Sequence, residues 1–184
     1  METKTIAESS MGKLLIRLLA AVMESRFRYR FFGPTKLLAG ADILPGQVIL
    51  EVGCGTGYFT IPAARLIGET GRLVAMDVLP ESVALVSQKV QAANLTNVRV
   101  IKGTALETGL DVQSFHAVLL FGVIPAPMLP LDRLLPEMHR ILKPGGNLAV
   151  WPPIPVWLPQ SILRSGLFLD GSKRNGVHNF KRCQ

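Results

Sequence analysis

A glycine-rich turn is the part of this 184-residue sequence best suited to hold a ligand. The stretch EVGCGTGYFT carries glycines at every second position, Gly53, Gly55 and Gly57. Glycine at this density lets the backbone turn tightly and lets a ligand approach the main chain closely. Dinucleotide-binding turns use the spacing G-x-G-x-x-G/A, and here the last position of that pattern falls on Tyr58. The turn therefore predicts a nucleotide-like ligand, but its spacing does not match a dinucleotide.

Two carboxylates close to this turn narrow the choice of ligand. Glu51 stands just before the glycines, where a carboxylate would repel a pyrophosphate and suits an ammonium group. Asp77 ends the next predicted strand, twenty residues after Gly57, and a carboxylate there can accept hydrogen bonds from both ribose hydroxyls. A ligand with a ribose, a free amine and no phosphate, such as S-adenosylmethionine, fits both acids. The plainer alternative is a tight turn next to a solvated acid.

Alternating strand and helix patterns predict the scaffold that would bring these residues together. Strands are expected at 46–53, 71–78, 97–103, 115–123 and 147–151, and helices at 34–41, 58–68, 80–94, 130–146 and 161–168. The helix in 130–146 should end at Lys143, Pro144 and Gly145. Strands separated by helices form parallel units, and Asn175-Gly176 predicts a final hairpin. The pattern is that of a doubly wound α/β fold with a mostly parallel seven-stranded sheet and a C-terminal antiparallel hairpin.

The chain from about Leu44 to Val150 resembles class I S-adenosylmethionine-dependent methyltransferases. It is closest to the type 11 branch, with its small-molecule, quinone and lipid enzymes. EVGCGTG resembles the first motif of the family, and LLPEMHRILKPGGNLAV is similar to the helix, turn and strand that follow the fourth strand. The resemblance implies a Rossmann-like fold that ends in the predicted hairpin. It also implies S-adenosylmethionine as cofactor and S-adenosylhomocysteine as product.

The resemblance further implies which residues contact the cofactor. The backbone of Gly53–Gly57 would pass under the methionine part, and Asp77 would hold the ribose. Val78 and Leu79 would flank the adenine. The implied contacts are Glu51, Gly53, Cys54, Gly55, Gly57, Asp77, Val78, Leu79, Thr104, Ala105 and Phe121.

One of these positions departs from the family pattern. After the third strand the family often has Gly-Asp-Ala, whose acid binds the adenine amine, whereas this chain has Gly103-Thr104-Ala105. The Thr104 hydroxyl can accept one hydrogen bond, but a neutral acceptor makes a weaker bond than a carboxylate. Either cofactor affinity is modest or Glu107 takes part.

No catalytic base is identified, and no metal ligand set is predicted. Methyl transfer from a sulfonium is a direct displacement, so the protein mainly supplies proximity and alignment. The end of the fourth strand, FGVIPAPMLP, holds no acid, His or Lys and no Asp/Asn-Pro-Pro-aromatic box of nucleic-acid amino-methyltransferases. Structural roles are expected for the three histidines, His116, His139 and His178.

The loops expected around the acceptor are apolar. GVIPAPML follows the fourth strand, and WPPIPVWLP, which carries Trp151 and Trp157, follows the fifth. Apolar walls with few polar groups suit a lipophilic or aromatic acceptor. The prolines could equally do no more than stiffen short connections.

Basic residues concentrate at the two ends of the chain. The net charge of +7 divides into +3 for residues 1–50, zero for 51–150 and +4 for 151–184. We expect a helical arm in residues 1–43 and an S-adenosylmethionine-binding domain in 44–184. In MESRFRYRFFGP, arginines alternate with aromatic residues. Such a pattern can pack on the sheet, contact a membrane surface or cover a lipophilic substrate as a lid, or bind single-stranded nucleic acid.

The expected location is the cytoplasm, with contact to a membrane surface through the arm as one of the open interpretations. The two cysteines, Cys54 and Cys183, favour a reducing compartment. The leucine-rich run LLIRLLAAVM contains an arginine and is too short to span a bilayer. The acidic residues before it do not fit a signal peptide.

The sequence as a whole predicts a methyltransferase that acts on a small, lipophilic acceptor. The acceptor would be a lipid amine, an isoprenoid or an aromatic ring, methylated by direct displacement. Two alternatives stay open: a non-catalytic module of this fold that binds a partner or a membrane, and an RNA methyltransferase, although nucleic acid is the less favoured partner. The oligomeric state is not predicted.

Overall fold

The computed structural model describes residues 33–124, 129–152 and 160–184. Contacts divide the chain into two units, 1–33 and 34–184, and the second of these, the sheet unit, contains all the strands described below. Residues 1–32 of the predicted helical arm, Trp157 and most of the two apolar loops lie outside the described residues.

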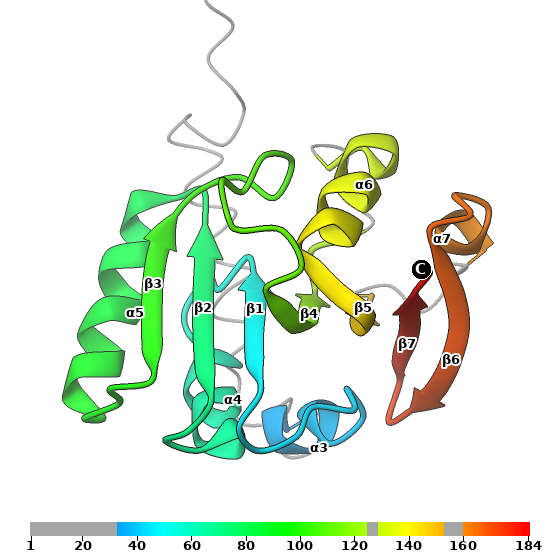
Figure 1. Cartoon of the computed structure of the whole chain (residues 1–184). Coiled ribbons are helices and arrows are strands. Elements are labelled where there is room, and N and C mark those ends of the chain that lie inside the picture. The colour runs from blue at the N-terminus through cyan, green and yellow to red at the C-terminus, as the bar shows by residue number, and fades with distance from the viewer. Residues whose placement is uncertain (1–32, 125–128, 153–159) are drawn as a thin grey trace, which may run out of the picture. The chain divides into compact units, whose positions relative to one another are not determined.

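The described residues contain a seven-stranded sheet with the strand order β3-β2-β1-β4-β5-β7-β6 (Figure 1). Its strands are β1 (Val48–Val52), β2 (Arg72–Asp77), β3 (Val98–Lys102), β4 (Phe115–Phe121), β5 (Leu142–Trp151), β6 (Phe168–Arg174) and β7 (Val177–Arg182). The first five strands pair in parallel, and β7 pairs antiparallel with both β5 and β6. This arrangement confirms the predicted α/β Rossmann-like fold with its C-terminal hairpin.

Strand β1 lies at the point where the strand order reverses. It pairs with β2 on one side and with β4 on the other. From β1 the chain builds outward through β2 and β3, and then returns to β4 and β5 on the other side. In open α/β sheets, ligands bind at the carboxyl ends of the strands at such a switch point. The glycine turn follows β1 directly, so the fold places it there.

Helices lie on the two sides of the sheet (Figure 1). They are α3 (Pro34–Leu38), α4 (Thr60–Ile67), α5 (Pro80–Ala92), α6 (Leu131–Ile141) and α7 (Gln160–Leu163). Neighbouring residues of β2 point to opposite faces: Ala75 packs with Val86 of α5, whereas Met76 belongs to the core that includes Leu134 of α6. The sheet is therefore apolar on both faces, as a doubly wound fold requires.

The end of α6 differs from the prediction. The helix ends at Ile141 and β5 begins at Leu142, so Lys143, Pro144 and Gly145 lie in the strand. Proline disfavours helical geometry in the residue before it, and this explains why the helix cannot include Lys143. The register with β4 is irregular at this point, since Phe115 pairs with Leu142 but Ala117 already pairs with Asn147.

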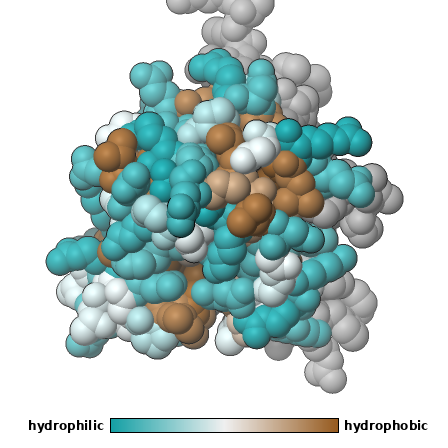
Figure 2. Space-filling model, turned by 45° about the vertical axis from the view of Figure 1, so that its right-hand side comes forward, coloured by the Kyte–Doolittle hydropathy of each residue, from teal (hydrophilic) through white to brown (hydrophobic). Residues whose placement is uncertain are grey.

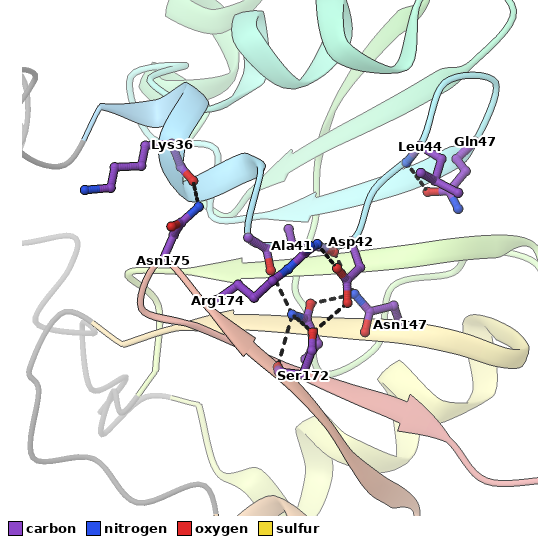
Figure 3. Close-up of polar contacts among 11 residues, drawn as sticks. Lys36, Ala41, Asp42, Leu44, Gln47, Asn147, Ser172, Arg174 and Asn175 are labelled. Atoms are coloured by element: carbon purple, nitrogen blue, oxygen red, sulfur yellow. Dashed lines mark hydrogen bonds and ion pairs between the residues drawn. The ribbon is translucent and has the colours of Figure 1, made fainter.

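Two buried asparagines hold the segment after α3 against the sheet (Figure 3). Asn147 of β5 donates to the Ala41 carbonyl, and Asn179 of β7 donates to the Gly40 carbonyl. A Cβ placed on Gly40 would lie 2.3 Å from the Arg174 carbonyl oxygen, so the close approach requires glycine. In the structure, residues 34–43 of the predicted arm are packed on the sheet unit.

The surface facing the viewer in Figure 2 is mostly hydrophilic, with apolar side chains in an area toward its upper right and in another near its bottom. Exposed large apolar residues of the described chain include Leu44, Leu66, Val78, Leu85, Val112 and Leu169. Val78 is more than half exposed, at 52%. It directly follows β2 and thus lies at the edge of the sheet where a ligand is expected.

Candidate cofactor site

The turn between β1 and α4 takes a backbone conformation that needs glycine. Gly53, Gly55 and Gly57 all have positive φ angles, of 72°, 52° and 82°. A Cβ on Gly53 would lie 2.4 Å from Val123 Cγ1, whereas a Cβ on Gly55 would meet only the Gly53 carbonyl oxygen, at 3.9 Å. Among the described residues, Val123 thus fills the space beside Gly53, and no side chain fills the space beside Gly55. This open side is where a ligand can approach the main chain.

The amide groups of the turn are bonded to acceptors of the protein itself. The N–H groups of Gly53 and Cys54 donate to the Met76 carbonyl, and Gly57 donates to the Cys54 carbonyl. Gly55 N–H donates to Asp77 Oδ2 at 2.9 Å. A phosphate-binding turn instead points its N–H groups at the anion. The hydrogen bonding therefore agrees with the sequence argument that this turn is not a pyrophosphate cradle.

Asp77 lies at the carboxyl end of β2 with both carboxylate oxygens engaged. Oδ2 accepts from Gly55, and Oδ1 accepts from the N–H of Leu79 at 3.0 Å. These bonds aim the carboxylate across the end of β1 toward the turn. A carboxylate has about four acceptor sites, so two remain for ribose hydroxyls. Asp77 is largely buried, at 8% exposed.

Glu51 is a buried carboxyl that accepts a hydrogen bond from a hydroxyl of the next helix. It is 2% exposed, and Thr60 Oγ1 donates to Glu51 Oε2 at 2.6 Å. Burial raises the pKa of Glu51 to about 8, with the charge of Asp77 acting in the same direction and the Thr60 bond opposing it. A cation brought next to Glu51 would favour its ionised form. An ammonium group beside Glu51 would therefore have to displace this proton, so binding of the group would be coupled to proton release.

The remaining predicted contacts lie at the same edge of the sheet. Cys54 is buried in the turn, and its burial raises the pKa of the thiol, which keeps the sulfur protonated and unreactive. Val78 and Leu79 follow β2, and Phe121 ends β4. Ala105 is 4% exposed and belongs to the core between the sheet and α6. The fold brings the whole set together, and contact with the cofactor stays a prediction.

Thr104 has a local role in the structure. Its Oγ1 accepts a hydrogen bond from Leu106 N–H at 3.3 Å, and its backbone forms an isolated bridge with Glu107. Gly103 N–H donates to the Asp77 carbonyl, which ties the end of β3 to the end of β2. Thr104 and Glu107 therefore lie next to each other, close to Asp77. This position is compatible with an adenine amine bound by Thr104 or by Glu107.

Aromatic side chains from three elements meet beside the turn. Phe59 makes edge-to-face contacts with Tyr58, Phe121 and Trp151, at centroid distances of 4.9, 5.0 and 6.1 Å. Phe121 and Trp151 end β4 and β5, the strands on the far side of β1 from Asp77. Phe59, Phe121 and Trp151 are buried, so the group is a packed aromatic cluster at the carboxyl edge of the sheet.

Sequence reasoning missed three residues that shape this site. Thr60 bonds the buried Glu51, Phe59 joins the aromatic side chains, and Lys89 of α5 donates to the Thr56 carbonyl of the turn at 2.8 Å. The sequence contains a signal for Thr60, because a hydroxyl in the first turn of the helix after the glycines lies close to the end of the preceding strand. The sequence contains no such signal for Lys89, because no pattern within α5 links this residue to Thr56.

The three histidines have structural surroundings. Val48 N–H donates to His116 Nδ1, and Lys143 Nζ lies 2.9 Å from its Nε2, at the amino end of the sheet. His139 packs on Phe168 and His178 stacks on Phe180, and burial lowers the pKa of both imidazoles. Among the described residues, no group of three or more His, Cys, Asp or Glu side chains could hold a metal ion.

Comparison with known proteins gives the family. Residues 49–146 match a family described as a methyltransferase domain. A demethylmenaquinone methyltransferase of Bacillus cereus is 35% identical over 108 residues, which are 58% of this chain and 45% of that protein. The chain thus spans about half the length of the curated relatives it matches.

Solved structures agree on the fold. An S-adenosylmethionine-dependent methyltransferase from Aquifex aeolicus has a TM-score of 0.71 at 24% identity, covering 92% of this chain and 96% of its own. A putative methyltransferase from Methanococcus maripaludis has a TM-score of 0.72 at 13% identity, covering 100% and 97%. Within the described ranges, no helix is long and apolar enough to cross a membrane. From the matched family and the fold, the chain belongs to the class I S-adenosylmethionine-dependent methyltransferases.

Proposed function

We propose that this methyltransferase acts on a small, lipophilic acceptor, which is a lipid amine, an isoprenoid or an aromatic ring. The observation that supports the proposal is the aromatic cluster of Tyr58, Phe59, Phe121 and Trp151 at the carboxyl ends of β4 and β5. Aromatic rings favour offset or edge-to-face contacts with other rings. The curated relatives are demethylmenaquinone methyltransferases, which supports an acceptor of quinone type.

The proposed cofactor position follows from the polar residues on the other side of β1. Asp77 holds the ribose, Glu51 faces the ammonium group, and the open side of Gly55 accepts the methionine part. The adenine lies between Val78 and Leu79, near Thr104. The methyl group then projects from the turn toward β4 and β5, where the aromatic side chains lie.

The chemistry needs little from the protein beyond alignment. Bound S-adenosylmethionine supplies an activated methyl group, because its sulfonium sulfur leaves with the electron pair of the S–CH₃ bond as neutral S-adenosylhomocysteine. The residues of this chain hold the two reactants in line, which accounts for much of the acceleration in such a displacement. A carbon or nitrogen of the acceptor forms the new bond, and the proton it loses passes to water.

The N-terminal arm is proposed as the cover of the acceptor site and as the contact to a membrane surface from which a lipophilic acceptor is drawn. Arginines interleaved with aromatic residues in 24–32 support this role. Removal of residues 1–32 should leave the thermal unfolding of the sheet unit almost unchanged. It should lower methyl transfer and binding to vesicles of anionic lipid. If the truncated protein does not fold, the arm belongs to the core.

The first experiment measures the cofactor and then the acceptor. Calorimetric titration with S-adenosylhomocysteine should show binding, and NAD should not bind. Methyl transfer from isotope-labelled S-adenosylmethionine is then followed with three acceptors: a demethylated naphthoquinone, phosphatidylethanolamine vesicles and ribosomal RNA. We expect label in the quinone or the lipid.

The outcomes separate the alternatives. Label in RNA alone, together with steeply salt-dependent RNA binding, would identify an RNA methyltransferase. Cofactor binding without label in any acceptor would favour a non-catalytic module of this fold. Failure of S-adenosylhomocysteine to bind would refute the cofactor site itself.

A further inference from the structure

Lys89 of α5 makes a long-range contact with the glycine turn. Its ammonium group donates to the Thr56 carbonyl at 2.8 Å, over a separation of 33 residues along the chain. Lys89 and Val86 are one helical turn apart and therefore lie on the same face of α5. A Cβ on Gly57 would lie 3.4 Å from Val86 Cγ2 and 3.8 Å from Lys89 Cδ. The side chains of Val86 and Lys89 thus pack against the turn from the side of α5.

The peptide between Thr56 and Gly57 is held at both of its polar ends. Its carbonyl accepts from Lys89, and its N–H donates to the Cys54 carbonyl at 2.8 Å. The carbonyl and N–H of a trans peptide point in opposite directions within one plane. Two partners on opposite sides therefore fix the orientation of that plane.

A fixed peptide plane has a larger effect on ligand affinity in a glycine-rich turn than in most turns. With three glycines in five residues, the unbraced segment has access to many backbone conformations, which lowers the fraction in any one of them. The apparent affinity of a ligand falls in proportion to the fraction of protein in the binding conformation. A hydrogen bond from a charged donor is among the stronger ones available to select that conformation.

We propose that Lys89 is a positioning residue for the cofactor, which holds the glycine turn in the conformation that binds the methionine part of S-adenosylmethionine. The inference rests on the cofactor position proposed above. It adds a residue outside the turn and outside the predicted contacts. Lys89 acts through the Thr56 carbonyl and does not itself touch the reacting atoms.

The test compares two ligands in Lys89→Met, which keeps the length of the side chain and removes the donor. One ligand is S-adenosylhomocysteine. The other is 5′-methylthioadenosine, which carries the adenosine part but lacks the amino-acid chain. Lys89→Met should weaken the first about tenfold and the second less than twofold, because only the first uses the turn. Lys89→Arg retains a charged donor and should recover most of the loss. Lys173→Met, an exposed position on β6, serves as the matched control.

A second measurement reports on the turn without a ligand. Amide hydrogen exchange of Gly57 should become faster in Lys89→Met, while the thermal unfolding temperature stays close to that of the wild type. Unchanged affinity for S-adenosylhomocysteine in Lys89→Met would overturn the proposal. Equal losses for both ligands would also overturn it, because they would indicate a general effect on the fold. No binding by the wild type would instead refute the cofactor site, and the positioning role with it.

Discussion

The buried carboxyl of Glu51 should make the ligand-free protein less stable as the pH rises. Its pKa in the folded protein is about 8, against an ordinary value of 4.5. Between these two values the unfolded chain has released the proton while the folded protein still holds it. The folded state then binds more protons than the unfolded state, so the free energy of unfolding falls as the pH increases through this window.

The limit of this effect follows from the two pKa values. Each pH unit between 4.5 and about 8 contributes at most about 1.4 kcal/mol, which gives a limit of about 5 kcal/mol. This is a large part of the roughly 5–15 kcal/mol that stabilises a typical domain. Relaxation and water entry around a buried carboxylate reduce its cost. We therefore expect Glu51 to lower stability by about 1–4 kcal/mol from pH 5 to pH 8.5.

The assay is urea unfolding of the wild type and Glu51→Gln at these two pH values. Glutamine has the shape of a protonated glutamate and keeps an oxygen that can accept from Thr60. Other titrating groups contribute equally to both proteins, so they cancel in the difference between the two pH dependences. Glu51→Gln should lose less stability than the wild type over this range, by the amount above.

Glu137→Gln is the control for a carboxyl of opposite character. The Arg140 guanidinium and the hydroxyl and N–H of Thr108 bond this carboxylate and lower its pKa to about 2. Its charge does not change between pH 5 and pH 8.5, so this substitution should leave the pH dependence of the wild type intact. The stabilisation by this mostly solvent-screened pair is present above its ordinary pKa and is lost only as the pH falls toward 2.

Equal pH dependence in Glu51→Gln and in the wild type would show that Glu51 is already ionised in the folded protein, and would refute the reasoning. If the cofactor ammonium lies beside Glu51, S-adenosylhomocysteine should also displace a proton from it at pH 7. Titration in two buffers with different heats of ionisation measures that proton. Glu51→Gln should release none from this site.

Three further substitutions test the site and the scaffold. Gly55→Val should abolish S-adenosylhomocysteine binding, because a branched side chain would fill the open side and strain a φ of 52°. The control is Gly166→Val, which imposes similar strain at a positive-φ position on the α7–β6 connection and should leave binding intact. Normal binding by Gly55→Val would contradict the argument that a ligand approaches the backbone at this turn. Asp77→Ala should weaken S-adenosylhomocysteine at least about tenfold by loss of charge-assisted bonds to the ribose, and unchanged affinity in calorimetry would mean that the ribose lies elsewhere. Asn179→Ala should lower the free energy of unfolding by about 1–3 kcal/mol, because the Gly40 carbonyl loses its buried donor; a smaller change in urea unfolding would show that water replaces the amide.

Features that depend on neighbouring residues could be predicted from the sequence. The alternation of apolar strands and amphipathic helices determined the order of elements, and Asn175-Gly176 determined the hairpin, since such a pair favours the positive φ values of a tight turn. The glycine turn and the acid at the end of the next strand are also local patterns. The fold places both at the switch point because parallel strands bring their carboxyl ends to one edge.

The boundary between α6 and β5 could not be predicted from local sequence patterns. Helix signals continue to Lys143, but Pro144 disfavours helical geometry there, and pairing of Leu142 with Phe115 extends the strand toward the helix. The pairing partner is 27 residues away in the sequence. A sequence pattern within one segment contains no information about this pairing.

The parts of the site that only the tertiary structure decided are contacts between segments far apart in the chain. Lys89 reaches Thr56 across 33 residues, and Phe59 meets Trp151 from a different element. The unusual pKa of Glu51 likewise depends on how completely the sheet and α4 bury it. Residue types and spacing indicate which chemistry a chain can hold. Burial and long-range packing, which exist only once the chain has folded, decide the charge of that site and the rigidity of its turn.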